Sequence, residues 1–223
     1  KRYLVCNMEA SIVIPTLNEE KNLRILLQQI DHKKYEIIVV DGGSTDKTVE
    51  TAKKFGLKVL YTPKGKGTAL RKGMDAAKSD IVVTMDADLS HRISELGLLI
   101  EAIKSGYDIC TGSRFIMGGG TDDMPLYRKL GNKFFVWLVN IIWGTNYSDL
   151  CYGYRSFRKD VIRKLNLESD GFGIETEISI KVAKKKLKVI EIPSYEKKRI
   201  HGEGKLRSVS DGFSILKRIL KEM

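Results

Sequence analysis

ASIVIPTLNEEKNLRILLQQI, residues 10–30, begins with an unbroken apolar run and continues with apolar residues spaced for one face of a helix. The same order of strand and helix recurs after YEIIVVD, KVLYT and IVVTMD. Unbroken apolar strands are buried on both faces, and their alternation with amphipathic helices is typical of βαβ units. Residues 10–115 therefore predict an α/β fold, a doubly wound, mainly parallel sheet with helices on both faces.

The pattern changes after residue 115, where the glycine-rich stretch FIMGGGTDD precedes longer helices and short strands. Helices are predicted over residues 125–143, 173–187 and 208–223, and short strands at YRSF and KVIEIPSY. No Pro- or Gly-rich linker divides the chain. We therefore expect residues 1–223 to form one domain with an elaborated C-terminal half from about residue 116.

The composition narrows the class of protein. The chain has 223 residues, enough to bury a substantial core, and its formal charge of +11 favours anionic partners. Its three cysteines lack C-x-x-C spacing, which argues against a disulfide framework or a zinc site and favours a reducing, cytoplasmic setting. Residues 1–9 do not resemble a signal peptide, and the most apolar segment, residues 134–143, is too short to span a bilayer.

MDADLSH, residues 85–91, places two aspartates one residue apart at the end of a predicted strand. Side chains two positions apart share a face of a strand, so the carboxylates of Asp86 and Asp88 can converge on one cation. Because two carboxylates repel each other, we expect a positive charge beside them. Mg²⁺ or Mn²⁺, bound through these carboxylates and substrate phosphates, fits that requirement. The alternative is that Asp86 only ends the strand and Asp88 opens a turn.

Other phosphate-binding and catalytic patterns are absent or weak. The first strand leads into PTLNEE and not into G-x-G-x-x-G, and GKGT at residues 65–68 lacks the order of a Walker loop. The GKGT segment is either a helix start whose amides bind phosphate or a flexible surface loop. No hydrolytic triad is apparent, and His91 is expected to face solvent at a helix start.

Cations recur through the C-terminal half, as Arg114 in GSR, Arg128 in LYRK, and Arg199 with Lys205 in RIHGEGKL. The glycines between the last two favour a loop that folds over a bound anion. A metal ion held by two carboxylates, with these cations nearby, indicates chemistry at a diphosphate.

Seven motifs now stand in one order: PTLNE, VDGGSTD, GKGTAL, MDADLSH, GSR, SDLCYGYRSFRK and RIHGEGKL. That order resembles the inverting family 2 glycosyltransferases with the GT-A fold, and within them the dolichol-phosphate mannose synthases most closely. The resemblance runs from about Ala10 to Lys217. MDADLSH and R-x-x-G-x-x-K-L are its most specific parts.

The resemblance implies roles for individual residues. It implies a nucleoside pocket lined by Pro15, Leu17, Glu19, Val39 and Asp41. It implies a metal and diphosphate site made by Asp86, Ala87, Asp88 and Ser90, with the metal ligands among Asp86, Asp88 and Ser90. It further implies that Arg114, Arg199 and Lys205 engage the donor and that Arg128 contacts the acceptor phosphate. Asp88, Arg128 and Arg199 are the residues it ties most directly to catalysis.

Two departures from the family pattern bear on these roles. The family usually has two adjacent aspartates where this chain has Asp41 followed by Gly42, which leaves guanine versus uracil open. Relatives often carry glutamine where Ser90 stands, so the shorter side chain can leave a water on the metal.

The resemblance implies metal-dependent inverting transfer of a hexose, mannose first, from GDP-mannose or a UDP-hexose to a dolichyl or polyprenyl phosphate. A lipid monophosphate is largely dianionic at neutral pH and attacks without a general base, which agrees with the lack of an obvious base. The alternatives are a family 2 enzyme with a glycan or glycolipid acceptor and a non-catalytic basic module. The chain carries no recognised nucleic-acid motif, so nucleic acid is not an expected partner.

A lipid acceptor gives PLYRKLGNKFFVWLVNIIW a function. A helix with basic residues first and aromatic residues later can lie in the headgroup layer with its apolar side down. We therefore expect a peripheral protein on the cytoplasmic face of a membrane. A buried core helix or a dimer face is the competing interpretation.

Overall fold

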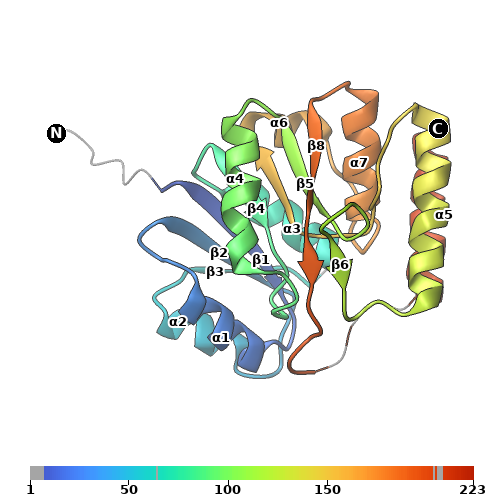
Figure 1. Ribbon diagram of the computed structural model, residues 1–223. Coiled ribbons are helices and arrows are strands. Elements are labelled where there is room, and N and C mark those ends of the chain that lie inside the picture. The colour runs from blue at the N-terminus through green and yellow to red at the C-terminus, as the bar shows by residue number, and fades with distance from the viewer. Residues whose placement is uncertain (1–7, 64, 203, 205–207) are drawn as a thin grey trace.

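A seven-stranded sheet organises the protein, whose computed structural model describes residues 8–63, 65–202, 204 and 208–223 (Figure 1). The strand order is β3-β2-β1-β4-β7-β5-β8. These strands are β1 Ala10–Thr16, β2 Tyr35–Asp41, β3 Val59–Tyr61, β4 Ile81–Thr84, β5 Ile109–Ser113, β7 Arg155–Arg158 and β8 Val189–Pro193. Two short strands, β6 Gly120–Thr121 and β9 Tyr195–Glu196, pair separately beside the sheet.

The helices cover both faces of the sheet, as the sequence predicts. They are α1 Glu20–Gln29, α2 Thr48–Lys54, α3 Lys66–Ala76, α4 Leu96–Lys104, α5 Leu126–Trp143, α6 Lys159–Leu165, α7 Ile174–Lys184 and α8 Ser208–Glu222, with a 3-10 turn at Ile93–Glu95. Helix α6, strand β6 and the separation of KVIEIPSY into β8 and β9 were not predicted.

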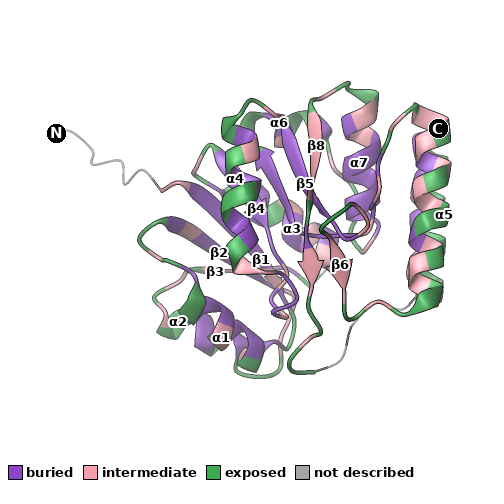
Figure 2. Ribbon diagram, viewed as in Figure 1, coloured by how far each residue is buried: buried purple, intermediate pink, exposed green. Residues whose placement is uncertain are grey.

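Alternating side chains of the central strands divide the core into two layers. Ile12 and Ile14 of β1 pack with α1, α2 and α4, whereas Val13 between them packs with α3, α6 and α7. Helix α3 lies so close to the sheet that a Cβ at Gly73 would fall 2.2 Å from Val13 Cγ1. The buried strands in Figure 2 are therefore apolar on both sides, which explains their unbroken apolar sequence.

Strand β7 is the exception to the parallel sheet. It pairs antiparallel with β4 on one side and with β5 on the other. The remaining pairs, β1 with β2, β1 with β4, β2 with β3 and β5 with β8, are parallel. The sheet is thus mainly parallel, and the predicted fold class is confirmed.

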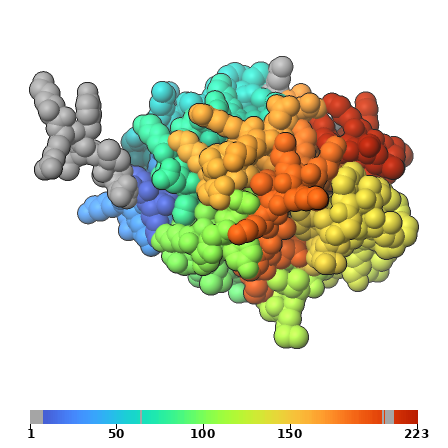
Figure 3. Space-filling model, turned by 90° about the horizontal axis from the view of Figure 1, so that it is seen from above, coloured from blue at the N-terminus to red at the C-terminus, as the bar shows by residue number. Residues whose placement is uncertain are grey.

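A third apolar cluster lies beyond the sheet, where α5 and α8 pack against α7. Val139 of α5, Ile180 of α7, and Ile215 and Ile219 of α8 form its buried centre. Figure 3 shows α5 and α8 side by side at one end of the molecule. Among the described residues, no helix combines the length and the apolar character needed to cross a bilayer.

Candidate active site

Most of the predicted site residues gather where β1, β2 and β4 end. PTLNE covers the end of β1, DGGST begins at the last residue of β2 and MDADLSH follows β4, and these three parallel strands are neighbours in the sheet. Ligands of doubly wound sheets bind at the carboxyl ends of strands. The segment after β9 carries Arg199 to the same edge.

Asp88 is held in a tight turn after β4. Leu89 adopts a left-handed conformation with φ 67°, which turns the chain so that Ser90 donates to Asp88 Oδ1 through both its amide, at 3.1 Å, and its hydroxyl, at 2.6 Å. The other carboxylate oxygen of Asp88 accepts from Arg199 Nη2 at 3.0 Å. Asp88 and Ser90, predicted as metal ligands, are therefore direct neighbours.

Arg199 joins the ends of two strands. Its Nη1 donates to both carboxylate oxygens of Glu19, at 2.8 and 3.0 Å, while its Nη2 binds Asp88. Asn22 donates from Nδ2 both to Glu19 Oε2, at 2.7 Å, and to the carbonyl of His201, at 3.0 Å. The chain around residues 199–201 is thereby held over the first helix turn of α1. Lys205 lies outside the described residues, and its role stays a prediction.

Asp86 has a different cation, Lys66. The ammonium of Lys66 lies 2.8 Å from Asp86 Oδ1 and 3.0 Å from Glu175 Oε1, and the Lys66 side chain is only 16% exposed. Burial raises the pKa of Asp86, but the positive charges of Lys66 and Arg199 outweigh burial, so the pKa of Asp86 lies below its usual value. Asp86 is therefore ionised at neutral pH.

The sequence predicts a positive charge beside the aspartates but not that Lys66 supplies it. For GKGT it predicts either a helix start that binds phosphate or a flexible surface loop. In the structure the amides of Gly67 and Thr68 donate to the Asp170 carbonyl at 2.8 and 3.2 Å, so both donors already have a protein partner. A Cβ at Gly67 would lie 2.2 Å from the Ser169 carbonyl oxygen, which explains the glycine.

The loop of SDLCYGYRSF supports the Lys66 pair. A Cβ at Gly153 would lie 3.1 Å from Lys66 Nζ and 3.3 Å from Asp86 Oδ2, so glycine leaves room for both side chains. Fully buried Arg155 holds this loop against α7 by donating to the carbonyl of Tyr152 at 2.8 Å and to that of Glu175 at 3.0 Å. The basic residue in YRSF is the only sequence signal for this role.

His91 does not face solvent, and that prediction was wrong. Its side chain is 2% exposed and stacks on Tyr154 with ring centroids 4.6 Å apart. Burial lowers the pKa of His91, so the ring is neutral, and its Nδ1 accepts the amide hydrogen of Asp86 at 3.2 Å. His91 thus fixes the backbone of the motif from inside the core.

Residues expected around the nucleoside differ in exposure. Leu17 is 38% exposed, whereas Val39 and Ala87 are buried in the core on the α1 side. Asp41 is 2% exposed, and its carboxylate accepts from the amides of Gly43 and Ser44, both at 2.9 Å. Glu19 contacts Arg199 as described above, and Pro15 lies within β1. Their roles toward a nucleoside stay predictions.

Arg114 has strong protein partners. It binds Asp149 through Nε at 2.7 Å and Nη2 at 2.9 Å, and Glu196 through Nη1 at 3.1 Å. These ion pairs connect the end of β5 to the loop that contains Asp149 and to β9. The contact of Arg114 with the donor stays a prediction. Neither Asp149 nor Glu196 was identified from the sequence as its partner.

Arg128 lies in the first turn of helix α5, which begins at Leu126. Burial and the charges of Glu196 and Asp88 raise the pKa of Asp123, while the charges of Arg128 and Arg199 lower it. Arg128 and Arg199 thus act in the same direction on one carboxylate. The predicted contact of Arg128 with an acceptor phosphate stays a prediction.

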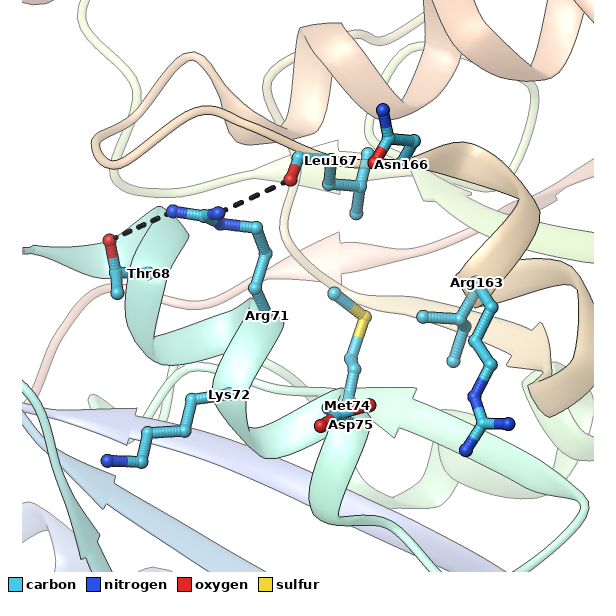
Figure 4. A pocket seen from close by; sticks show the side chains of 9 residues that line it. Thr68, Arg71, Lys72, Met74, Asp75, Arg163, Asn166 and Leu167 are labelled. Carbon is cyan, nitrogen blue, oxygen red and sulfur yellow. Dashed lines mark hydrogen bonds between the residues drawn. The ribbon is translucent and has the colours of Figure 1, made fainter.

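A pocket between α3 and α6 is separate from this cluster. It has a volume of about 380 Å³ and is lined by Thr68, Arg71, Lys72, Met74, Asp75, Ile162, Arg163, Asn166 and Leu167. Figure 4 shows Arg71 spanning it to reach Thr68 and the Leu167 carbonyl. None of the site residues predicted from the sequence lines this pocket.

The oxygen atoms of the cluster suit a hard divalent cation. Within the described part of the chain, no three His, Cys, Asp or Glu side chains converge on one point. Asp86, Asp88 and Ser90 offer carboxylate and hydroxyl oxygens, and Mg²⁺ commonly binds through one or two carboxylates while substrate phosphates and water complete its shell. These residues fit such an ion as a partial ligand set.

Comparison with known proteins agrees with this arrangement. A sequence model described as glycosyl transferase family 2 matches residues 11–165. The dolichol-phosphate mannosyltransferase of Pyrococcus furiosus is 39% identical over 97% of this chain, which spans 64% of that relative's length. The dolichyl-phosphate hexose transferase of Haloferax volcanii is 30% identical over 96% of this chain and 93% of its own.

Solved structures agree on the fold. Glucosyl-3-phosphoglycerate synthase from Mycobacterium tuberculosis, crystallised with Mn²⁺, uridine diphosphate and glucosyl-3-phosphoglycerate, superposes with a TM-score of 0.74. The match covers 96% of this chain and 79% of that one at 20% sequence identity. The chain therefore belongs to glycosyl transferase family 2 and has the GT-A fold.

Proposed function

We propose that this protein transfers a hexose, with inversion, from a nucleoside-diphosphate sugar to a dolichyl or polyprenyl phosphate, with GDP-mannose as the first candidate donor. The observation that carries the proposal is the convergence of Asp88, Ser90, Glu19 and Arg199 at the carboxyl ends of β1 and β4. The relatives named dolichol-phosphate mannosyltransferase and polyprenol monophosphomannose synthase support the choice of acceptor.

The reaction places its largest charge on the leaving group. An acceptor phosphate oxygen forms a bond to the anomeric carbon while the bond from that carbon to the β-phosphate oxygen breaks, so negative charge grows on the departing diphosphate. A divalent ion held by Asp86 and Asp88 would supply a Lewis acid at that oxygen. Arg199 lies 3.0 Å from Asp88 and would add a fixed positive charge there.

The acceptor needs no general base if it is a phosphate. A lipid monophosphate carries an ionised oxygen at neutral pH, and Arg128 would orient it beside the donor. A glycan acceptor would instead need a carboxylate to remove its proton. Asp149 is 1% exposed and bound to Arg114, and Glu175 is 3% exposed and paired with Lys66, so neither is placed for that task.

A transfer assay tests this proposal. Purified protein would be incubated with labelled GDP-mannose, UDP-glucose or related donors, with Mg²⁺ or Mn²⁺, and with either polyprenyl phosphate or a glycan. We expect label in the lipid fraction only, and its loss on metal chelation. Transfer to the glycan with no transfer to lipid phosphate would contradict the acceptor, and full turnover after chelation would contradict the metal.

The outer face of α5 supports a membrane-bound acceptor. The helix exposes a stripe of large apolar residues, Leu126, Leu130, Phe134, Trp137 and Ile141, each at least half exposed. Phe213 of α8, 70% exposed, extends this face, and with Phe134 and Phe135 it lines an apolar groove of about 290 Å³. A buried core helix would not expose such a stripe. Large exposed apolar patches mark membrane or protein contacts.

We expect this face to bind lipid. Changing Trp137 to glutamate should weaken binding to vesicles of phosphatidylglycerol and phosphatidylcholine about tenfold or more, because one buried aromatic side chain contributes about 1.5–3 kcal/mol. Co-sedimentation with vesicles measures this. Leu98→Glu is a matched control, since Leu98 is 54% exposed on α4. Equal vesicle binding by both variants, together with loss of a dimer only in Trp137→Glu, would indicate a dimer face instead.

The cytoplasmic setting is also a proposal. Among the described residues, Cys110 and Cys151 are free thiols. Free cysteines are usual in reducing compartments.

A further inference from the structure

The ends of three neighbouring strands form one surface beside the site described above. Thr16, Asp41 and Tyr61 are the last residues of β1, β2 and β3, and they lie in register across the sheet. Beyond them, the Gly42 amide donates to the Thr16 carbonyl and the Thr62 amide to the Asp41 carbonyl, both at 2.8 Å. The ends of the three strands are therefore tied together into one rigid edge.

Two glycines form the floor of this surface and two apolar side chains flank it. The Leu17 Cβ lies 3.7 Å from the position of a Cβ on Gly42, and the Tyr61 hydroxyl lies 3.6 Å from that on Gly43. Leu17 is 38% and Tyr61 58% exposed. We call Leu17, Gly42, Gly43 and Tyr61 the glycine platform.

The glycines cannot readily be replaced. Gly43 has φ +99°, a conformation that L side chains rarely adopt, and a Cβ on Gly42 would lie 3.3 Å from the Thr16 carbonyl oxygen. Both positions therefore stay without side chains, and Leu17 and Tyr61 provide the apolar contacts beside them.

The carboxylate of Asp41, next to the glycine platform, already accepts hydrogen bonds from neighbouring residues of the chain. Asp41 accepts from the amides of Gly43 and Ser44 and from the hydroxyls of Ser44 and Thr16. Both oxygens of this 2% exposed carboxylate therefore have partners within the chain. A nucleobase that binds here gains little from Asp41, and the exposed tyrosine ring is the larger available contact.

We propose that Tyr61 is the aromatic wall of the nucleobase site and that this wall favours purine over pyrimidine nucleoside diphosphates. The inference rests on the proposed function and specifies its donor class. Stacking needs only a π-face, so it acts on every base, and a bicyclic purine overlaps the ring over a larger area than a pyrimidine does. The family's second aspartate is replaced by Gly42 in this chain, so the residues after Asp41 do not decide between guanine and uracil. Tyr61 would then supply the preference for a purine base.

Calorimetric titration of GDP, UDP and inorganic pyrophosphate with Mn²⁺ tests this role. In Tyr61→Ala we expect GDP to bind about fivefold to 100-fold more weakly, as for loss of one base–aromatic stack, and UDP to lose less. Tyr61→Phe keeps the ring and should bind GDP within about twofold of the unchanged protein. Pyrophosphate has no base, so its affinity should be the same in both variants. Tyr127→Ala, an exposed tyrosine on α5, is the matched control for nucleotide binding.

Kinetics separate stacking from a structural effect. A stack present in both the ground and transition states should raise the donor KM in Tyr61→Ala while kcat stays within about twofold. Unchanged GDP affinity, or an equal loss of pyrophosphate affinity, would overturn the assignment. Equal losses for GDP and UDP would overturn the purine preference. If the unchanged protein binds no nucleoside diphosphate, the proposed function fails; if it binds them and Tyr61→Ala binds them equally, only this inference fails.

Discussion

Asp88→Asn is expected to lower kcat for sugar transfer by about 10³-fold or more. The variant keeps the shape of the side chain but removes the charge that meets Arg199 Nη2 at 3.0 Å and that would hold the metal. Both effects leave the charge on the departing diphosphate less stabilised. Initial rates with saturating donor and lipid phosphate measure the loss.

The fold should survive this change. Arg199 keeps both contacts with Glu19, and the turn at Leu89 does not depend on the charge of Asp88. The melting temperature should therefore stay close to that of the unchanged protein. Asp75→Asn, an exposed aspartate on α3, is the matched control and should retain full activity. An Asp88→Asn variant with normal turnover would remove Asp88 from the mechanism.

Lys66→Met is expected to reduce the free energy of unfolding by about 3 kcal/mol, the low end for breaking a buried ion pair. The substitution leaves Glu175, whose side chain is 4% exposed, with no neutralising ammonium, while Asp86 keeps 29% exposure and some contact with water. Urea unfolding measures the change. Lys54→Met on exposed α2 should change stability little.

A double variant and a pH series distinguish the pair from general packing. Adding Glu175→Gln to Lys66→Met should restore part of the lost stability, because the buried charge is then also removed. The lowered pKa of Asp86 means that the stability of the pair is present above the unfolded-state pKa and is lost as pH falls through the folded-state pKa. The raised pKa of Lys66 keeps the ammonium charged until strongly alkaline pH. The difference between Lys66→Met and the unchanged protein should therefore be constant from about pH 5 to about pH 10 and shrink in acid. A difference that does not vary with pH and is not reduced by Glu175→Gln would indicate packing alone.

The sequence predicted what local patterns encode. The apolar strands, their helices and the polar strand ends follow from periodicity. The place of Arg199 near Asp88 was implied by the resemblance to the family and not by periodicity. The features it missed depend on residues distant in the chain. The ion pairs of Lys66 with Glu175 and of Arg114 with Asp149 were not predicted. The residues next to Lys66 and Arg114 in the sequence do not indicate which distant carboxylate each of them binds.

His91 shows the same limit in the opposite direction. A histidine after a polar strand end resembles an exposed helix start. The position is buried because Tyr152 and Tyr154, which precede β7, pack against the His91 ring. The direction of β7 was also beyond local patterns, because a strand of four residues has the same period in either orientation.

The position of β7 has a consequence for synthesis on the ribosome. Strand β5 leaves the ribosome before β7 does, yet β7 lies between β4 and β5, so β5 cannot join the nascent sheet directly. Until residues 155–158 emerge, β4 presents an unpaired edge of apolar residues, the kind of surface that recruits other chains. The interval between the synthesis of β4 and that of β7 is therefore the time when the growing polypeptide is most exposed to aggregation and most in need of a chaperone.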